Sequence, residues 1–189
     1  MATTKRAGAA QLPERITAIP AGRASQLFRW NRALIALHGI QALIIVLISP
    51  TDAKVNFEGS YPVAKIVDGV FAGLTTGTKE LFGIPLAYVV AAFFGLSALA
   101  HFLVAFPLRD RYERWLAQSF NPMRWAEYAL SSTLMIVAIA SLTGIRDAGA
   151  MLAIAGCNAS MNLFGWSMEE GNIGRKAVQW SHYIFGCIA

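Results

Sequence analysis

The sequence predicts an all-α transmembrane helical bundle with four full spans, the start of a fifth, and a short extracellular β-hairpin. Two observations predict this fold class. Of the 189 residues, 56% are hydrophobic and only 14% are charged, whereas a soluble domain has about 25% charged residues. In addition, four apolar runs have about 17 to 25 residues each, enough for a helix to cross ~30 Å of hydrocarbon. The chain is therefore expected to be an integral membrane protein.

The first part of the chain is expected to form a tail and then a span. Residues 1–26 are polar, small and basic, and we expect them to form a cytoplasmic tail, with residues 27–189 forming the bundle. The first span is expected at about 31–49, before Pro50. It is as long as a span and is not followed by a small-residue cleavage pattern, so we do not expect a cleaved signal peptide.

The remaining elements follow a long connection at 51–83. This loop contains the β-prone pieces KVNFEG and YPVAKIV and the turn-rich AGLTTGT, which together predict the hairpin. Further spans are expected at about 84–107, 124–144 and 148–166. A run at 177–189 begins a fifth helix, but its thirteen residues would make only about 20 Å of helix and would not cross a bilayer.

The distribution of basic residues predicts the orientation in the cell membrane. With the N-terminus inside, twelve of the 16 Lys and Arg residues fall on inner segments and four on outer segments. By the positive-inside rule this places the N-terminus in the cytoplasm. The net charge of +5 is then a topology signal, and binding to nucleic acid is not expected. The outer four are Lys54, Lys65, Lys79 and Arg146.

Each predicted span carries one narrow polar stripe. In a membrane such side chains normally face a partner or a water-filled cavity, because exposing them to lipid is costly. Members of a stripe lie three, four or seven residues apart, which places them on one face of a helix. The stripes contain Asn31, His38 and Gln41, then Ser97 and His101, Glu127 and Ser131, and Asn158 and Asn162.

These stripes agree in depth. His38 and His101 are both about 9 Å from the predicted cytoplasmic end of their helices. Glu127 is about 5 Å from its own end and Asn162 about 10 Å. Unrelated polar residues would not be expected to share one level. We therefore expect a hydrogen-bonded polar cavity in the cytoplasmic half of the bundle, with one carboxylate and two imidazoles.

Simpler interpretations exist for the same residues. Glu127 can be a first-turn acid that is stabilised by the helix dipole and reaches water. A lone histidine in a membrane helix is more often a packing group than a ligand. A metal site is not expected, because no HxxxH or CxxC spacing occurs. An enzyme is not expected either, because the hydroxyl groups of Ser131, Ser132 and Thr133 are typical of helix packing.

Four stretches resemble heliorhodopsins, which are rhodopsins with a cytoplasmic N-terminus. They are NRALIALHGIQ, GLSALAHF, EYALSSTLMIVAIA and LAIAGCNASMNLFGW. The resemblance runs from about Asn31 to the end of the chain. It implies a seven-helix rhodopsin fold, here truncated after the start of helix 5. It also implies a light-sensing membrane photoreceptor that binds all-trans retinal, forms a homodimer and acts in signal transduction through a partner that the sequence does not identify.

The resemblance assigns roles to the polar residues. Glu127 matches the counterion of the retinal Schiff base, and His38 and His101 match histidines that border its cavity. Polar positions near this cavity or the retinal pocket are matched by Gln41, Ser97, Ser131 and Asn158.

The retinal lysine of the family is not found in these 189 residues. The five lysines, all expected in tails or loops, are Lys5, Lys54, Lys65, Lys79 and Lys176. An alternative function is therefore a retinal-independent membrane module, or a proton-conducting subunit, that uses the same His/Glu cavity. In either case membrane lipid is an expected partner.

Overall fold

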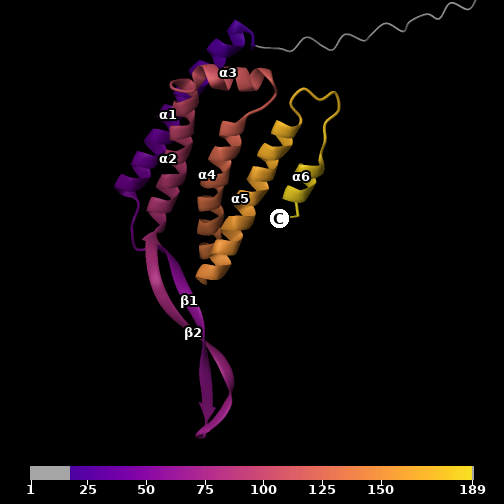
Figure 1. Ribbon diagram of the computed structural model, residues 1–189. Coiled ribbons are helices and arrows are strands. Elements are labelled where there is room, and N and C mark those ends of the chain that lie inside the picture. The colour runs from indigo at the N-terminus through magenta and orange to yellow at the C-terminus, as the bar shows by residue number, and fades with distance from the viewer. Residues whose placement is uncertain (1–17, 189) are drawn as a thin grey trace, which may run out of the picture.

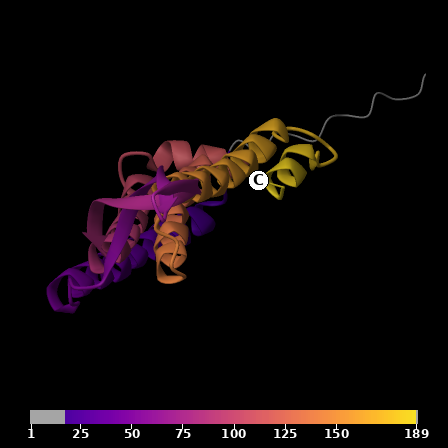
Figure 2. The same cartoon turned by 90° about the horizontal axis from the view of Figure 1, so that it is seen from below.

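The computed structural model describes residues 18–188, and most of them are helical. The long helices pack side by side in the order α1, α2, α4, α5, and α6 packs against α5 (Figure 1). Seen along the bundle, α1 and α6 lie at opposite ends of this row (Figure 2). The elements are α1 (Ala21–Ile48), β1 (Lys54–Val67), β2 (Val70–Pro85), α2 (Leu86–Ala105), α3 (Arg109–Ala117), α4 (Pro122–Leu142), α5 (Ala148–Gly171) and α6 (Ser181–Gly186).

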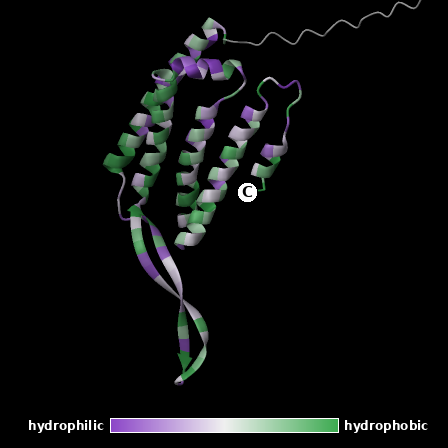
Figure 3. Cartoon of the chain, viewed as in Figure 1, coloured by the Kyte–Doolittle hydropathy of each residue, from purple (hydrophilic) through white to green (hydrophobic). Residues whose placement is uncertain are grey.

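Three of the described helices, α1, α2 and α4, are long and apolar enough to cross a membrane. Figure 3 shows hydrophobic residues along these helices and hydrophilic residues on α3, which lies across one end of the bundle. The fourth predicted span falls on α5, which has 24 residues but is not among those three. Its span therefore stays a prediction. The predicted fifth helix at 177–189 is represented by α6, which has six residues.

Helix α1 begins about ten residues earlier than predicted, with Pro20 at its N-cap. Its first turns form a helix because they pack on the α2–α3 corner. The Phe28 ring meets the Phe106 ring edge to face, with centroids 5.9 Å apart, and the Arg109 guanidinium lies 4.5 Å from the Phe28 centroid. The predicted tail thus includes the start of α1, and its residues 1–17 lie outside the described part of the chain.

The connection between α1 and α2 is an antiparallel hairpin of 14 and 16 residues, longer than the short hairpin expected. Its turn is Asp68–Gly69, where both residues have positive φ, 52° and 78°. An Asp-Gly pair suits a two-residue type I′ turn. The stretch AGLTTGT, expected as a turn, lies within β2, because Asp68–Gly69 already reverses the chain and threonine favours strands. That the hairpin is extracellular stays a prediction.

The base of the hairpin is fixed to the turn between α4 and α5. The Glu58 N–H donates to the Arg146 carbonyl at 2.8 Å, and the Ser60 hydroxyl donates to the Asp147 carboxylate at 2.5 Å. A small buried core lies beside these bonds, and it joins the hairpin to α2, α4 and α5. Its members are Val55, Val89, Ala138, Ala140 and Met151. The hairpin is therefore held by both polar and apolar contacts.

Helices α4 and α5 approach closely at Gly165. A Cβ atom at this position would lie 2.3 Å from Cζ3 of Trp125, well inside the sum of van der Waals radii. The absence of a side chain at Gly165 lets the indole of Trp125 on α4 pack directly against the backbone of α5. Small residues are commonly used in this way to bring membrane helices together.

We predict that Gly165→Ala destabilises the bundle by about 1–3 kcal/mol, because the added methyl group overpacks against Trp125. Thermal unfolding in detergent measures the change. Gly156→Ala, in the same helix, is the control, because no atom lies within 4 Å of its added Cβ. Equal stability of the two variants would contradict the close approach.

A second prediction concerns pH. Hydrogen bonds from the Ser60 hydroxyl and the Ala150 N–H lower the pKa of Asp147 from its ordinary value of 3.8. A lowered folded-state pKa means that the anchoring is present above the unfolded pKa and is lost as the pH falls through the folded value. Below about pH 4 we expect faster hydrogen exchange of hairpin amides, corrected for intrinsic rates. In Asp147→Asn this pH dependence should be absent, and its persistence would contradict the anchoring role.

Candidate functional site

A polar cavity of about 470 Å³ lies between α1, α2, α3 and α4. Each of the four elements contributes polar side chains to its wall, and Asn121 of the α3–α4 turn adds another. The lining residues are Asn31, His38, Phe93, Ser97, Ala100, His101, Val104, Tyr112, Asn121, Met123, Arg124, Glu127, Tyr128, Ser131 and Ser132. Among these, Glu127 is the one acidic residue.

The Glu127 carboxylate is held from the facing helix. The Ser97 hydroxyl on α2 donates to Glu127 Oε1 on α4 at 2.6 Å. Ser97 itself is buried, with 8% of its surface exposed. A hydrogen bond to a carboxylate in low dielectric is stronger than one between neutral groups. The bond therefore fixes Glu127 toward the cavity, which argues against the interpretation of Glu127 as an acid that merely reaches bulk water.

The two histidines lie face to face in the cavity wall. The His38 and His101 rings are nearly parallel, at 9°, with centroids 5.7 Å apart. His101 Nδ1 lies 2.8 Å from Asn31 Oδ1, and His38 Nδ1 lies 3.0 Å from Gln41 Oε1. Because an amide oxygen only accepts, Nδ1 carries the hydrogen in both rings. In the neutral rings Nε2 is then left as a proton acceptor.

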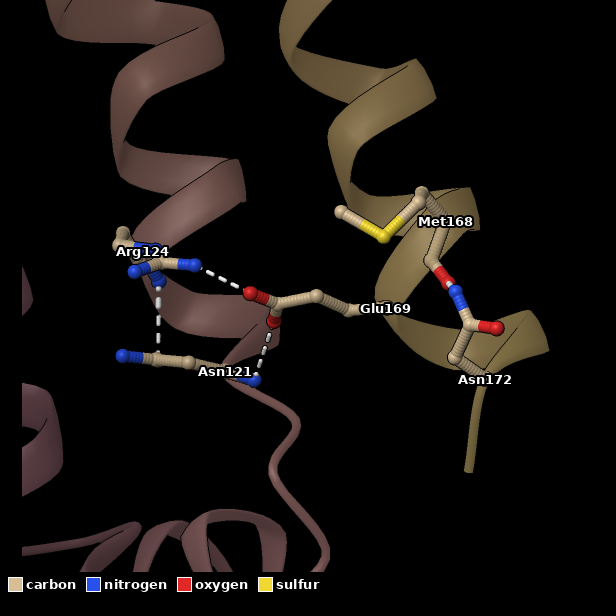
Figure 4. A network of polar contacts seen from close by, with 5 residues as sticks. All are labelled: Asn121, Arg124, Met168, Glu169 and Asn172. Atoms are coloured by element: carbon tan, nitrogen blue, oxygen red, sulfur yellow. Dashed lines mark hydrogen bonds and ion pairs between the residues drawn. The ribbon is translucent and has the colours of Figure 1, made fainter. Parts of the chain in front are cut away.

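The cation in the cavity wall already has an anionic partner. The Arg124 guanidinium forms an ion pair with Glu169 near the C-terminal end of α5 (Figure 4). The backbone N–H of Asn121 donates to the other oxygen of Glu169 at 2.8 Å. The side chain of Asn121 caps α4 by accepting from the Arg124 N–H at 3.2 Å. Glu169 thus ties α5 to the start of α4 and takes up the charge of Arg124.

Tyr112 reaches the cavity from α3, outside the predicted spans. Burial raises the pKa of its phenol, and this effect exceeds the lowering by a hydrogen bond with Asn31 and by the nearby Arg124. Because Asn31 also accepts from His101, it connects α3 to the histidine pair. The hydroxyl of Tyr112 therefore belongs to the same polar network as the imidazoles.

Five of the seven predicted site residues line the cavity: Glu127, His38, His101, Ser97 and Ser131. Gln41 does not line it but is hydrogen-bonded to His38. Asn158 does not line it either. Its side chain donates to Ser132 Oγ at 2.8 Å and to Thr133 Oγ1 at 2.9 Å, across the α4–α5 interface. The structure thus places Asn158 in the α4–α5 interface, where it contacts Ser132, a residue of the cavity wall.

Several lining residues were not among the predicted site residues. Asn31 had a sequence signal, because it lies seven residues before His38 on the same helical face. Arg124 stands one turn before Glu127, but its position alone suggested a membrane-surface cation. Tyr112 and Asn121 gave no signal, because they lie on α3 and in the turn after it, and their approach to the cavity depends on how α3 folds back.

The comparisons with known proteins decide the family. The family model for heliorhodopsin matches residues 27–189. The chain belongs to the heliorhodopsin family. No curated protein matches the chain. Heliorhodopsins are retinal-binding rhodopsins of membranes and are photoreceptors, not classical enzymes, so the chain is an integral membrane protein of that general type. The family match agrees with the resemblance seen in the sequence.

The heliorhodopsin cavity fits the charged end of retinal in its donor and acceptor groups. It offers one carboxylate and two imidazole nitrogens for a cationic nitrogen. The four lysines that the structure describes, Lys54, Lys65, Lys79 and Lys176, do not line the cavity. Within residues 18–188 no cluster of three or more His, Cys, Asp or Glu side chains could hold a metal ion.

We predict that Asn158→Ala lowers bundle stability by about 1 kcal/mol, because two hydrogen bonds between α4 and α5 are lost. Thermal unfolding in detergent gives the value. The neighbouring exposed thiol provides the control, Cys157→Ala, which should change stability little. A loss no larger than that of the control would show that Asn158 does not join the helices.

Proposed function

We propose that this chain supplies the counterion side of a light-sensing retinal site, in which Glu127 balances the positive charge of the retinal Schiff base. The observation that carries this proposal is the charge distribution of the cavity. Glu127 is its one acidic lining residue among those described, and the cation beside it, Arg124, is paired with Glu169. Glu127 therefore remains available for a different cation.

The energetic cost of a carboxylate within an apolar bundle also supports this proposal. An isolated carboxylate at this depth is costly, and a buried pair with further hydrogen bonds is the arrangement that offsets the cost. Ser97 supplies one such bond. All-trans retinal, when bound, would supply light absorption and the cationic nitrogen.

The neighbouring side chains have separate tasks in the proposal. Ser97 orients the carboxylate of Glu127 toward the cavity. His38 and His101 present Nε2 atoms that can hold a proton released within the cavity, and Asn31 and Gln41 fix the orientation of the rings. Movement of the Schiff-base proton to a histidine would change the hydrogen bonds of this network. Because Tyr112 of α3 belongs to the network, the change would also affect α3.

The lysine must come from elsewhere in this proposal, because none of the described lysines lines the cavity. We propose that a lysine other than these four provides it. We further propose a cytoplasmic N-terminus, on the strength of the inner excess of basic residues, with α5 as a fourth span and the protein acting as a homodimer in signalling.

The colour of the pigment tests the counterion. Expression of the whole reading frame with all-trans retinal should give a visible absorption band. We predict that Glu127→Gln shifts this band to longer wavelength, because the carboxylate no longer stabilises the charge at the nitrogen. Glu170→Gln removes an exposed carboxylate at the end of α5 and should leave the spectrum unchanged.

Two outcomes would count against the proposal. A pigment whose spectrum ignores Glu127→Gln would remove Glu127 from the counterion role. If the whole reading frame gives no visible band but makes liposomes permeable to protons, the alternative of a retinal-independent proton path through the His/Glu cavity would be favoured.

A further inference from the structure

A second pocket, of about 410 Å³, lies at the end of the bundle that carries α3. It shares no lining residue with the polar cavity. Its wall combines two arginines and a glutamine with three apolar side chains. The lining residues are Arg111, Arg114, Trp115, Gln118, Phe120 and Ile173, and we call it the α3 pocket.

The two arginines of the α3 pocket are available to a ligand. They are exposed and stand three residues apart, which places them on neighbouring positions of one helix face. Among residues 18–188, neither guanidinium has an ion-pair partner, whereas Arg109 on the same helix pairs with Glu113. No acidic residue lines the pocket. Arginine forks of this kind bind phosphate oxygens with two parallel hydrogen bonds.

The pocket is also lined by the aromatic side chains of Trp115 and Phe120, and Phe120 is held in place by its packing. The Phe120 side chain is buried, with 7% exposed. It meets Trp115 edge to face at 6.5 Å and Trp166 at 6.3 Å. A free phosphate ion would gain nothing from such a wall. A ligand with a phosphate at one end and hydrocarbon at the other would use both sides.

The location of the pocket also favours a ligand with both a phosphate and hydrocarbon. Helix α3 lies crosswise at the ends of α2 and α4, so it runs along the level at which these apolar helices end (Figure 1, Figure 3). Tryptophan is enriched at that level of a membrane, and basic clusters there attract anionic lipids.

We propose that the α3 pocket binds the phosphate headgroup of an anionic phospholipid, with Arg111 and Arg114 on the phosphate and Trp115 against the glycerol and the first acyl carbons. This site is independent of retinal and of the role of Glu127. Its effect is to fix α3, whose Tyr112 lines the polar cavity, to the membrane surface.

Native mass spectrometry of the full chain in detergent tests the ligand on the wild type. The probes are phosphatidylglycerol, phosphatidylcholine and inorganic phosphate. Phosphatidylglycerol should bind about tenfold more tightly than phosphatidylcholine, since only the former is a net anion for the two arginines. An excess of inorganic phosphate should not displace it, because phosphate does not contact the aromatic wall.

Paired charge removals test the residues. The double variant Arg111→Gln/Arg114→Gln should lose about tenfold in affinity for phosphatidylglycerol. Arg23→Gln/Arg29→Gln removes the same charge from exposed positions on α1, at the same end of the bundle, and should change affinity less than about twofold.

Three results would overturn the proposal. Equal losses in the two double variants would mean that general charge, not the pocket, attracts the lipid. Equal binding of the two lipids to the wild type would exclude recognition of the anionic headgroup. Displacement of phosphatidylglycerol by an excess of inorganic phosphate would make the site one for a small phosphate compound. The last two results use the wild type alone, so they decide the matter even if a variant fails to fold.

Discussion

One carboxylate set into an apolar bundle is the constraint on which the polar part of this structure depends. Glu127 would be costly in lipid without partners. The Glu127 carboxylate is stabilised by a hydrogen bond from Ser97 on the neighbouring helix. It also lies in a cavity lined by imidazoles, amides and hydroxyls. Because these groups come from several elements, the position of Glu127 requires that α1, α2 and α4 pack in one register.

The ion pair between Arg124 and Glu169 keeps the positive charge of Arg124 from neutralising the nearby carboxylate of Glu127. Arg124 stands one turn before Glu127 and lines the same cavity. Its guanidinium turns instead to α5, where Glu169 also accepts from the Asn121 backbone. This arrangement ties α5 to α4 and leaves the cavity with an acid that forms no ion pair within residues 18–188. The proposed counterion role of Glu127 requires such an arrangement.

Helix α3 connects the site to its surroundings. One side of this short helix supplies Tyr112 to the cavity, while Arg111, Arg114 and Trp115 line a separate pocket at the end of the bundle. Its first residue, Arg109, also packs on Phe28 and so extends α1 beyond its predicted start. A change in the polar network of the cavity and a change in contacts at the membrane surface would therefore act on the same nine residues.

The sequence by itself determined where the long helices α1, α2, α4 and α5 lie and which family the chain belongs to, because uncharged runs of span length and four polar stripes are local patterns. It also predicted that His38, His101, Glu127 and Asn162 lie in one half of the bundle, since helical rise fixes depth once the ends are known. It did not predict the short helix α3 or the early start of α1. Only the tertiary structure decided which stripes meet. It turned Asn158 toward the hydroxyls of α4, and it brought Tyr112 and Asn121 to the cavity from segments without any regular pattern. The rotation of each helix and the fold-back of α3 depend on contacts between distant residues, and no periodicity along the chain records them.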